Sequence, residues 1–352
     1  AGASGRGVTV RERRVLTRSG FQIADPVYAY GATESAMRYG SSAWIEQIGS
    51  LRQSEVLRAI KNQLVACLVV SSVVVGIDLL SLNYAGRSFI PMIPSEPHSL
   101  VTSALGLLLV FRTNAAYDRF WEATTLWWEI AGNIRALVMW VESHLRGCGR
   151  SRAAEEATDV LERYVVLLPF AFKDHLRRVV NDEPFRSLLR EEDCRKLFEP
   201  GQNRPLCLMA MMTRAFDRLV NEGAVKPAEK AKAVEMCEGI VQMLSSCERI
   251  NCTTVPPDYT KHTTRFLTMW LFSLPLVLVH DIGIATIPVE VLIGWALFGI
   301  QQLGFEIENP FGVSTRADGE TQEQIPLESL CREILLDVEC LRKDLPDCTC
   351  ES

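Results

Sequence analysis

The chain has 352 residues, of which 48% are hydrophobic and 23% are charged, and its mean hydropathy lies just above zero. A soluble domain is usually more polar and a pure membrane bundle far more apolar, so we expect membrane spans and a water-facing part in one chain. The formal net charge of -6 argues against nucleic acid as a general partner.

Residues 1–33 are a basic arm that begins with small residues. Its arginines are Arg6, Arg11, Arg13, Arg14 and Arg18. We expect the arm to be extended or disordered up to about Phe21, either as a solvated tail or as a segment that packs on a neighbouring subunit or an anionic membrane surface. The start at Ala1 fits a cleaved organelle transit peptide and equally an artificial start.

The first membrane region, 34–116, opens with an amphipathic helix over 34–60, in which Trp44 is suited to anchor at a membrane interface. Residues 63–82 are long enough to cross a hydrocarbon core of roughly 30 Å. Their single charge is Asp78, which we expect at the membrane interface rather than in an aqueous vestibule.

A proline-containing loop, 83–97, leads into the second membrane helix, and Pro97 is suited to a first helical turn. The apolar run Leu100–Phe111 ends in Arg112 with no turn residue, so we expect the helix to continue out of the membrane. The run is rich in small residues, which permit close helix packing: Ser99, Thr102, Ser103, Ala104 and Gly106.

Residues 117–262 are polar and helical in pattern, with no alternating strand pattern of useful length. Helices are expected over 117–146, 153–172, 186–198, 204–221 and 226–250. This segment is therefore predicted to be a helical domain between two pairs of membrane helices.

The second membrane region, 263–306, is predicted to contain a span over 266–288, broken by Pro275 and by His280-Asp281, and another over 289–305. We expect Asp281 and Glu290 to mark the turn between them at the membrane face. A tail, 307–352, includes an amphipathic helix from about 327 to 341 and is expected to pack on the helical domain. Because each pair of spans returns to its own side, both termini and the domain share the basic side of the membrane.

Several kinds of chemistry are missing from the sequence. It contains no G-x-S-x-G, P-loop, dinucleotide fingerprint or H-E-x-x-H motif, so we expect no enzyme. Glu306 and Glu308 lie on different faces of a helix, which argues against acid–base catalysis by this pair of carboxylates. The eleven cysteines form no C-x-x-C pair and the five histidines form no i, i+4 pair, which predicts reduced thiols and neither a metal site nor a cofactor.

The second membrane helix is the candidate functional element. Leu100, Ala104, Leu107 and Phe111 share one helical face, with Ser103 beside it. A helix buried in a bundle would show the same pattern, but the abrupt change to charge at Arg112 favours a helix that lines a pore. Such a pore would lack a charged ring, and the helix N-terminus at Pro97-His98 would favour an anion.

Three ordered blocks of sequence resemble the bestrophin family, in its bacterial and plant branch. They are LLLVFRTNAAYDRFWEA at 107–123, the segment from Cys247-Glu-Arg-Ile250 to Phe266, and Asn309-Pro-Phe-Gly312. The motif residues expected to have structural roles are Arg112, Asn114, Tyr117, Asp118, Arg119, Glu122, Glu248, Arg249, His262, Arg265, Asn309 and Pro310.

The resemblance implies an all-α membrane protein with four membrane helices and a helical extramembrane domain, assembled with four identical subunits into a homopentamer around a central pore. The permeant ion would be chloride, with other monovalent anions, and membrane lipids would be further partners. The implied pore neck consists of Leu100, Ser103, Ala104 and Leu107, and the pore mouth of Glu96, Pro97 and His98. Animal members place bulky aromatics at the neck, so we expect a wider one here, or one set by Leu100 and Leu107.

The resemblance is strongest to plant thylakoid members, which implies voltage-driven chloride flux that adjusts how the proton-motive force divides between voltage and pH. The sequence Val313-Ser-Thr-Arg-Ala317 lacks the carboxylates of the animal calcium site, so we expect no calcium activation. There is no arginine-rich voltage-sensor helix. A cation-conducting relative, with Glu96 at the mouth, and a membrane-anchored scaffold without conductance stay open as alternatives, and a haem or metal enzyme is a more distant one.

Overall fold

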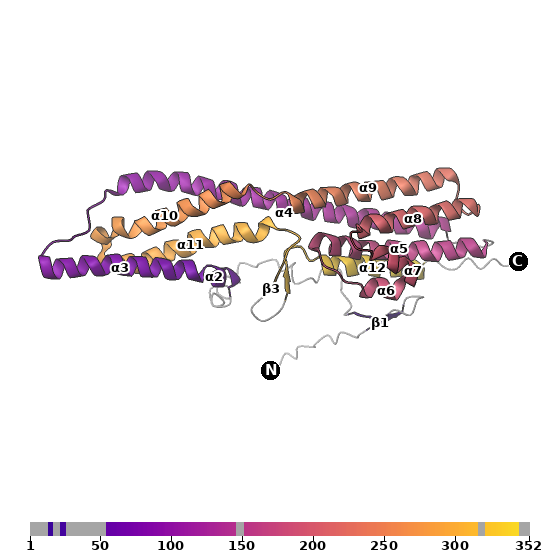
Figure 1. Cartoon of the computed structure of the whole chain (residues 1–352), viewed down its shortest axis with the longest axis horizontal. Coiled ribbons are helices and arrows are strands. Elements are labelled where there is room, and N and C mark those ends of the chain that lie inside the picture. The colour runs from indigo at the N-terminus through magenta and orange to yellow at the C-terminus, as the bar shows by residue number, and fades with distance from the viewer. Residues whose placement is uncertain (1–12, 17–21, 26–53, 146–150, 316–320, 345–352) are drawn as a thin grey trace, which may run out of the picture. The chain divides into compact units, whose positions relative to one another are not determined.

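The computed structural model describes residues 13–16, 22–25, 54–145, 151–315 and 321–344, and most of them are helical (Figure 1). The helices are α2 (Glu55–Ala59), α3 (Lys61–Ala85), α4 (Ser95–Leu145), α5 (Arg152–Arg177), α6 (Glu183–Leu188), α7 (Glu191–Leu197), α8 (Arg204–Asn221), α9 (Pro227–Cys252), α10 (Pro257–Ile282), the 3-10 turn η3 (Gly283–Ala285), α11 (Thr286–Glu308) and α12 (Leu327–Asp344). The mostly helical fold is as expected, while the first amphipathic segment and Trp44 fall largely or wholly outside the described residues.

Two short antiparallel hairpins accompany the helices, and the described chain stays mostly helical, as expected. The strands are β1 (Arg13–Leu16) with β2 (Gln22–Asp25), and β3 (Val313–Thr315) with β4 (Thr321–Glu323). Each strand has only three or four residues, which is too short for an alternating pattern to stand out in the sequence.

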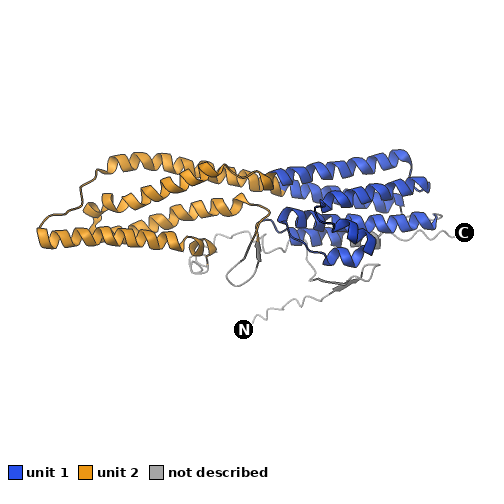
Figure 2. Cartoon of the chain, viewed as in Figure 1, with its two compact units in different colours: residues 1–39, 125–249, 325–352 blue, residues 40–124, 250–324 orange. Residues whose placement is uncertain are grey.

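The chain divides into two compact units, each with its own core (Figure 2). Unit 1 contains residues 1–39, 125–249 and 325–352, and unit 2 contains residues 40–124 and 250–324. α4 and α9 contribute residues to both units. Our assignment of 34–116 and 263–306 to the membrane and of 117–262 to a water-facing domain stays a prediction.

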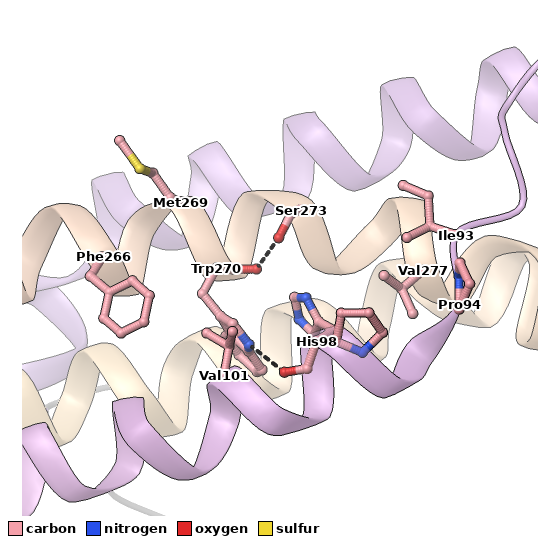
Figure 3. Close-up of a pocket in the computed structure, with 10 residues that line it drawn as sticks. Ile93, Pro94, His98, Val101, Phe266, Met269, Trp270, Ser273 and Val277 are labelled. Carbon is pink, nitrogen blue, oxygen red and sulfur yellow. Dashed lines mark hydrogen bonds between the residues drawn. The ribbon is translucent and has the colours of Figure 1, made fainter.

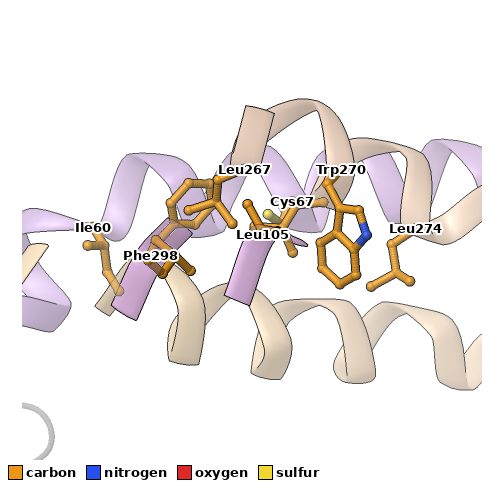
Figure 4. Close-up of a cluster of buried hydrophobic side chains, with 9 residues drawn as sticks. Ile60, Cys67, Leu105, Leu267, Trp270, Leu274 and Phe298 are labelled. Atoms are coloured by element: carbon orange, nitrogen blue, oxygen red, sulfur yellow. The ribbon is translucent and has the colours of Figure 1, made fainter. Parts of the chain in front are cut away.

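Unit 2 holds the apolar helices. In the described residues, three segments are long and apolar enough to cross a membrane: Lys61–Ala85, Ser95–Leu145 and Pro257–Glu308. The third segment consists of α10 and α11, which pack on each other and on α3. A central cluster of apolar side chains joins the start of α3 and Cys67 within it to α4, α10 and α11 (Figure 4): Ile60, Cys67, Leu105, Leu109, Leu267, Trp270, Leu271, Leu274 and Phe298.

The outer surface of α3 is also apolar. Several large aliphatic side chains are about half exposed in the single chain: Val65, Val69, Val73, Ile77 and Leu80. In water such a surface would be unfavourable, whereas lipid tails or a neighbouring membrane helix would cover it without a penalty. The surface of α3 therefore agrees with the expectation of a membrane span.

Two expectations about the spans were wrong. α10 continues through Pro275, because the helix needs to give up only one backbone hydrogen bond there, and it ends before Gly283, which has φ +54°. The turn between α10 and α11 lies at Gly283–Ala285, so Glu290 does not mark it; Glu290 is fully buried inside α11. Asp78 is buried and accepts a hydrogen bond from Ser88 Oγ, while its position at the membrane interface stays a prediction.

Unit 1 is a helical bundle built on strongly amphipathic helices. α5 packs along α8, and the C-terminal helix α12 packs on α5. Lys173 of α5, 5% exposed, places its Nζ 2.5 Å from Glu328 of α12 and 3.6 Å from Asp174. Burial alone would lower the pKa of Lys173, but the hydrogen bond and charge of Glu328 outweigh it and raise that pKa. This ion pair therefore holds α12 on the bundle.

Candidate permeation helix and its anchors

The predicted neck residues lie on an exposed face of α4. They are Leu100, Ser103, Ala104 and Leu107, with Leu100 75% and Leu107 55% exposed. Leu105 and Leu109 point the other way, into the core of unit 2, at 1% and 3% exposure. The exposed face stays apolar up to Phe111, which is 57% exposed. A single chain thus leaves this face uncovered, although whether it lines a pore stays a prediction.

The predicted mouth residues differ in how exposed their side chains are. Glu96 and Pro97, in the first turn of α4, are exposed. His98 is half-buried: its ring stacks on Trp270 of α10, with centroids 4.6 Å apart, and its carbonyl accepts a 3.3 Å hydrogen bond from Trp270 Nε1. His98 therefore ties the start of α4 to α10 within its own chain.

A groove of about 490 Å³ lies beside this contact (Figure 3). Its lining is almost entirely apolar and comes from the segment before α4, the first turns of α4, and α10: Ile93, Pro94, Pro97, His98, Val101, Phe266, Met269, Trp270, Ser273 and Val277. His98 Nε2 is buried there without a hydrogen-bond partner among the described residues. The groove offers apolar contact and no charged group.

Arg112 ends the apolar run of α4 but does not face solvent. It is 2% exposed, its guanidinium lies 3.7 Å from the ring centroid of Phe305, and its Nη2 lies 4.0 Å from a carboxylate oxygen of Glu308. Both partners belong to the last turn of α11. The cation–π contact and the ion pair offset only part of the cost of removing this charge from water, because no guanidinium nitrogen of Arg112 has a hydrogen-bond partner among the described residues.

Arg119 follows Arg112 by seven residues, which places it on the same face of the helix. Its Nη2 donates to the carbonyl of Ile250 at 2.8 Å, its Nη1 donates to the carbonyl of Thr253, and its Nε donates to the carbonyl of Glu308 at 3.3 Å. These carbonyls lie at the C-terminal ends of α9 and α11, where backbone acceptors lack helical partners and the helix dipole is negative. One guanidinium thus joins α4 to two helix ends.

The Asn309–Gly312 block forms the turn that ends α11. Pro310 cannot continue the hydrogen-bond ladder, Phe311 is buried at 1% exposure, and the Gly312 amide donates to the Asn309 carbonyl at 3.1 Å. A Cβ on Gly312 would lie 2.6 Å from Asn309 Nδ2, closer than real Cβ contacts allow. The block therefore fixes where the chain turns just after the partner of Arg112.

The remaining motif residues are distributed over both units. On α4, Asn114, Tyr117, Asp118 and Glu122 are exposed, and on α10, His262 and Arg265 are exposed. The ring of Tyr117 stacks on Trp121 at 6.5 Å, and that of His262 on Phe266 at 6.3 Å. Exposure of aromatic side chains on α4 extends its uncovered surface beyond the predicted neck.

Glu248 and Arg249 lie in the part of α9 that belongs to unit 1. Glu248 contacts His175 of α5, with 2.6 Å between carboxylate oxygen and Nε2, and it also accepts a 3.4 Å hydrogen bond from Asn203 Nδ2. This motif residue joins α5 and the start of α8 to α9, so its place is structural within the bundle.

The predicted site residues therefore form separate groups. Arg112 and Arg119 meet at the end of α11, the neck residues share one exposed face, and Glu248 belongs to unit 1. Sequence reasoning missed Phe305, Glu308 and Trp270 as their partners. Glu308 directly precedes the Asn309 block, but no local pattern connects it with an arginine 196 positions earlier (308 − 112). Within the described ranges, no three His, Cys, Asp or Glu side chains gather as metal ligands would.

A family model described as "Bacterial/Fungal Bestrophin protein" matches residues 36–340 of the chain. A voltage-dependent anion channel-forming protein of Synechocystis is 30% identical over 291 residues, which are 82% of this chain and 89% of that protein. The chloroplastic voltage-dependent chloride channel 1 of Arabidopsis thaliana is 28% identical over 302 residues, which are 82% of this chain and 71% of the relative. These relatives are named as channels and not as enzymes.

Among solved structures, a bacterial bestrophin homologue from Klebsiella pneumoniae matches with a TM-score of 0.69 and 24% identity. The match covers 82% of this chain and 100% of that chain. At this identity the likeness establishes the fold alone. The fold expected from the three sequence blocks is thereby confirmed, while the number of spans and of subunits stays a prediction.

Proposed function

Because the chain belongs to the bestrophin family, we propose that it is an anion channel that conducts chloride passively, driven by the membrane voltage. The chloroplastic relatives in Arabidopsis, which are named voltage-dependent chloride channels, support this proposal. The proposed location is the thylakoid membrane, with both termini and unit 1 on the stromal side. Chloride flux there would adjust how the proton-motive force divides between voltage and pH.

The exposed apolar face of α4 is the observation that carries the proposal. A helix that leaves Leu100 and Leu107 more than half uncovered, beside the small residues Ser103 and Ala104, needs other helices around it. In the proposed homopentamer, each subunit contributes α3, α4, α10 and α11 as its four spans, and five copies of α4 surround the pore. Membrane lipids cover the outer surface, including that of α3.

Selectivity in this proposal comes from the absence of charge in the neck and from the helix ends. The neck face bears no Lys, Arg, Asp or Glu between Leu100 and Leu107, so it holds no ion by charge. Five N-termini of α4 at the mouth present partial positive charge to an approaching anion. Chloride and other monovalent anions therefore enter more readily than cations, although Glu96 at the mouth opposes them.

Reversal potentials in asymmetric salt test the choice of ion. We expect purified protein in planar bilayers to give a reversal potential close to the chloride equilibrium potential. A value close to the cation equilibrium potential would favour the alternative in which exposed Glu96 selects cations. The absence of any current, with correctly assembled protein in the bilayer, would favour a scaffold.

Two substitutions test the neck. Ala104→Phe adds bulk to the narrow part and is expected to reduce single-channel conductance severalfold, whereas Leu100→Ala removes bulk and is expected to raise it. Val69→Ala on the outer surface of α3 is the matched control, since Val69 is 54% exposed and lies outside the proposed pore. Unchanged conductance in both neck variants would reject the assignment of this face to the pore.

A further inference from the structure

Glu290 is a carboxylic acid buried inside the apolar unit without a charged partner. It belongs to α11, its exposure is 0%, and neither carboxyl oxygen accepts a hydrogen bond of good geometry from the described residues, although Cys67 and Ser71 lie close enough to interact with it. Asp78, the other buried acid of unit 2, instead accepts a hydrogen bond from Ser88. The protonation state of buried Glu290 therefore needs an explanation, which a charged partner does not supply.

The groups that face Glu290 are weakly polar. α11 packs on α2, α3 and α10, and from these helices the polar side chains facing the carboxyl group are Cys67 and Ser71 of α3. Ser71 Oγ already donates to the Cys67 carbonyl at 2.8 Å. Cys67 is the one titratable group that faces Glu290 among the described residues, and no Lys, Arg or His does.

No partner can reach Glu290 from outside the chain. Because the side chain is fully covered by its own subunit, water, lipid headgroups and neighbouring subunits are all excluded from contact with it in this packing. The close approach of α11 to α3 continues one turn further along, where a Cβ on Gly294 would lie 3.3 Å from Cys67 Sγ. This contact places α11 close against α3 one turn beyond Glu290.

The carboxyl group lies at mid-depth of a membrane-spanning helix. Ser71, opposite Glu290, is the eleventh of the 25 residues of α3. At a rise of about 1.5 Å per residue, this level is roughly 15 Å from the start of α3 and about 20 Å from its end. An ionised carboxylate at that depth, without a cation or water, would be strongly disfavoured, while the neutral acid is tolerated.

We propose that Glu290 is a proton-binding site in unit 2, whose carboxyl group holds a proton for as long as α3 and α11 stay packed together. Loss of the proton requires water to enter between the two helices. The packing of unit 2 is therefore coupled to pH through one side chain. This proposal depends on the membrane position of unit 2 but not on the identity of the permeant ion.

Infrared spectroscopy of the purified protein tests the bound proton directly. At neutral pH we expect the absorption band of a protonated carboxyl group in the wild type, and its loss in Glu290→Gln. Asp281→Asn is the matched control: Asp281 is an exposed acid at the end of α10, and its substitution is expected to leave the band unchanged. A band equal in the wild type and in Glu290→Gln would overturn the proposal.

The pH dependence of stability is an independent readout. A side chain that keeps its proton in the folded chain but loses it on unfolding makes the folding equilibrium fall by about tenfold per pH unit as pH rises. The melting temperature of the wild type should thus fall between about pH 5 and neutral pH more steeply than that of Glu290→Gln, because the unfolded chain releases this proton at the ordinary pKa of a glutamate. If the glutamine variant does not purify, Glu290→Met, of similar length and without charge, replaces it in both measurements. Equal slopes would overturn the proposal.

Discussion

Arg119 is the residue at which three helices of unit 2 meet. It lies on α4 and donates to carbonyls at the ends of α9 and α11, so it fixes the part of the chain that follows the proposed neck. Hydrogen bonds from a charged donor each contribute about 1.5–3 kcal/mol to stability, more than neutral ones. This single side chain therefore stabilises the contact of α4 with the ends of both α9 and α11.

Substitution of Arg119 tests this role. Arg119→Ala should lower the free energy of unfolding by about 3 kcal/mol, which is less than the sum for three charged hydrogen bonds, because Arg119 is partly exposed and water can replace part of the lost donor. Arg119→Lys, which keeps the charge but cannot reach three acceptors in fixed geometry, should lose roughly half as much. Thermal melting of the purified protein in detergent measures both changes.

Arg265→Ala is the matched control, because Arg265 is an exposed arginine of α10 in the same unit. Its effect should stay within about 0.5 kcal/mol, as is usual at exposed positions. If Arg119→Ala melted like this control, the three hydrogen bonds would have no net stabilising effect, and the role inferred for Arg119 would be wrong.

At the scale of single elements, one buried ion pair ties α12 to α5, in addition to the apolar packing of α12. Lys173 of α5 is 5% exposed and pairs with Glu328 at 2.5 Å. Burial opposes the ionisation of Glu328, but the hydrogen bond and charge of Lys173 outweigh it and lower the pKa of this carboxyl group. Its stabilising contribution is therefore present above the unfolded-state value of 4.5 and is lost as pH falls through the folded-state value.

Glu328→Gln should release α12 from α5 at neutral pH. The uncompensated Lys173 would cost about 3 kcal/mol if the pair were fully buried, and we expect about 1–2 kcal/mol because the Glu328 side chain is 38% exposed. The variant should also lose part of the acid-induced fall in stability that the wild type shows. Burial raises the pKa of Asp174, so this group makes stability fall as pH rises, opposite to the effect of Glu328. Because both proteins contain Asp174, the pH dependence of stability is compared between the wild type and Glu328→Gln.

The exposed ion pair between Arg152 and Glu156 serves as the control for this experiment. Arg152 is 92% exposed, and the pair lies in the first turns of the same helix, α5. Arg152→Gln should change stability by less than about 0.5 kcal/mol. Hydrogen exchange in α12 should increase in Glu328→Gln but not in Arg152→Gln; equal protection in all three proteins would contradict the proposed anchoring.

The helices were predictable from the sequence to the extent that their signals are local. The apolar run passes into the charged residue Arg112 with no turn residue between them, and α4 is indeed continuous from Ser95 to Leu145. The bounds of α3, α8 and α12 also lie close to those expected. The position of Glu290 was not predictable, because an acidic residue at this point of the sequence could mark a turn or face another helix. Only the packing of α11 against α3 shows that it faces another helix.

At the scale of the whole molecule, the contacts between segments far apart in the sequence could not be predicted. Arg112 could be recognised as a motif residue, but its partners Phe305 and Glu308 lie almost 200 residues away, and no periodicity relates them. His98 was assigned to the pore mouth from the helix N-terminus, whereas stacking on Trp270 also gives it a place in the packing of its own chain. Such pairings depend on how helices cross, which side-chain spacing alone does not specify.

Assembly is the prediction that belongs to the whole molecule. The exposed face of α4 runs from Leu100 past Phe111 to the aromatic side chains of Tyr117 and Trp121, which are 53% and 61% exposed. The apolar part from Leu100 to Phe111, which the exposed polar residues Asn114 and Asp118 separate from Trp121, is unfavourable for an isolated chain and marks an interaction surface. Identical subunits arranged around an axis would bring this face of every copy toward the centre.

We expect images of the purified protein to show particles with five-fold symmetry and α4 nearest the axis. Tyr117→Lys and Trp121→Glu should weaken assembly if these side chains lie between subunits, because a charge would then be buried without a partner. Val65→Lys, on the outer surface of α3, controls for the general effect of adding a charge to unit 2. Monomeric wild-type particles would remove the pore, and a ring with α4 on its outside would assign the pore to another helix.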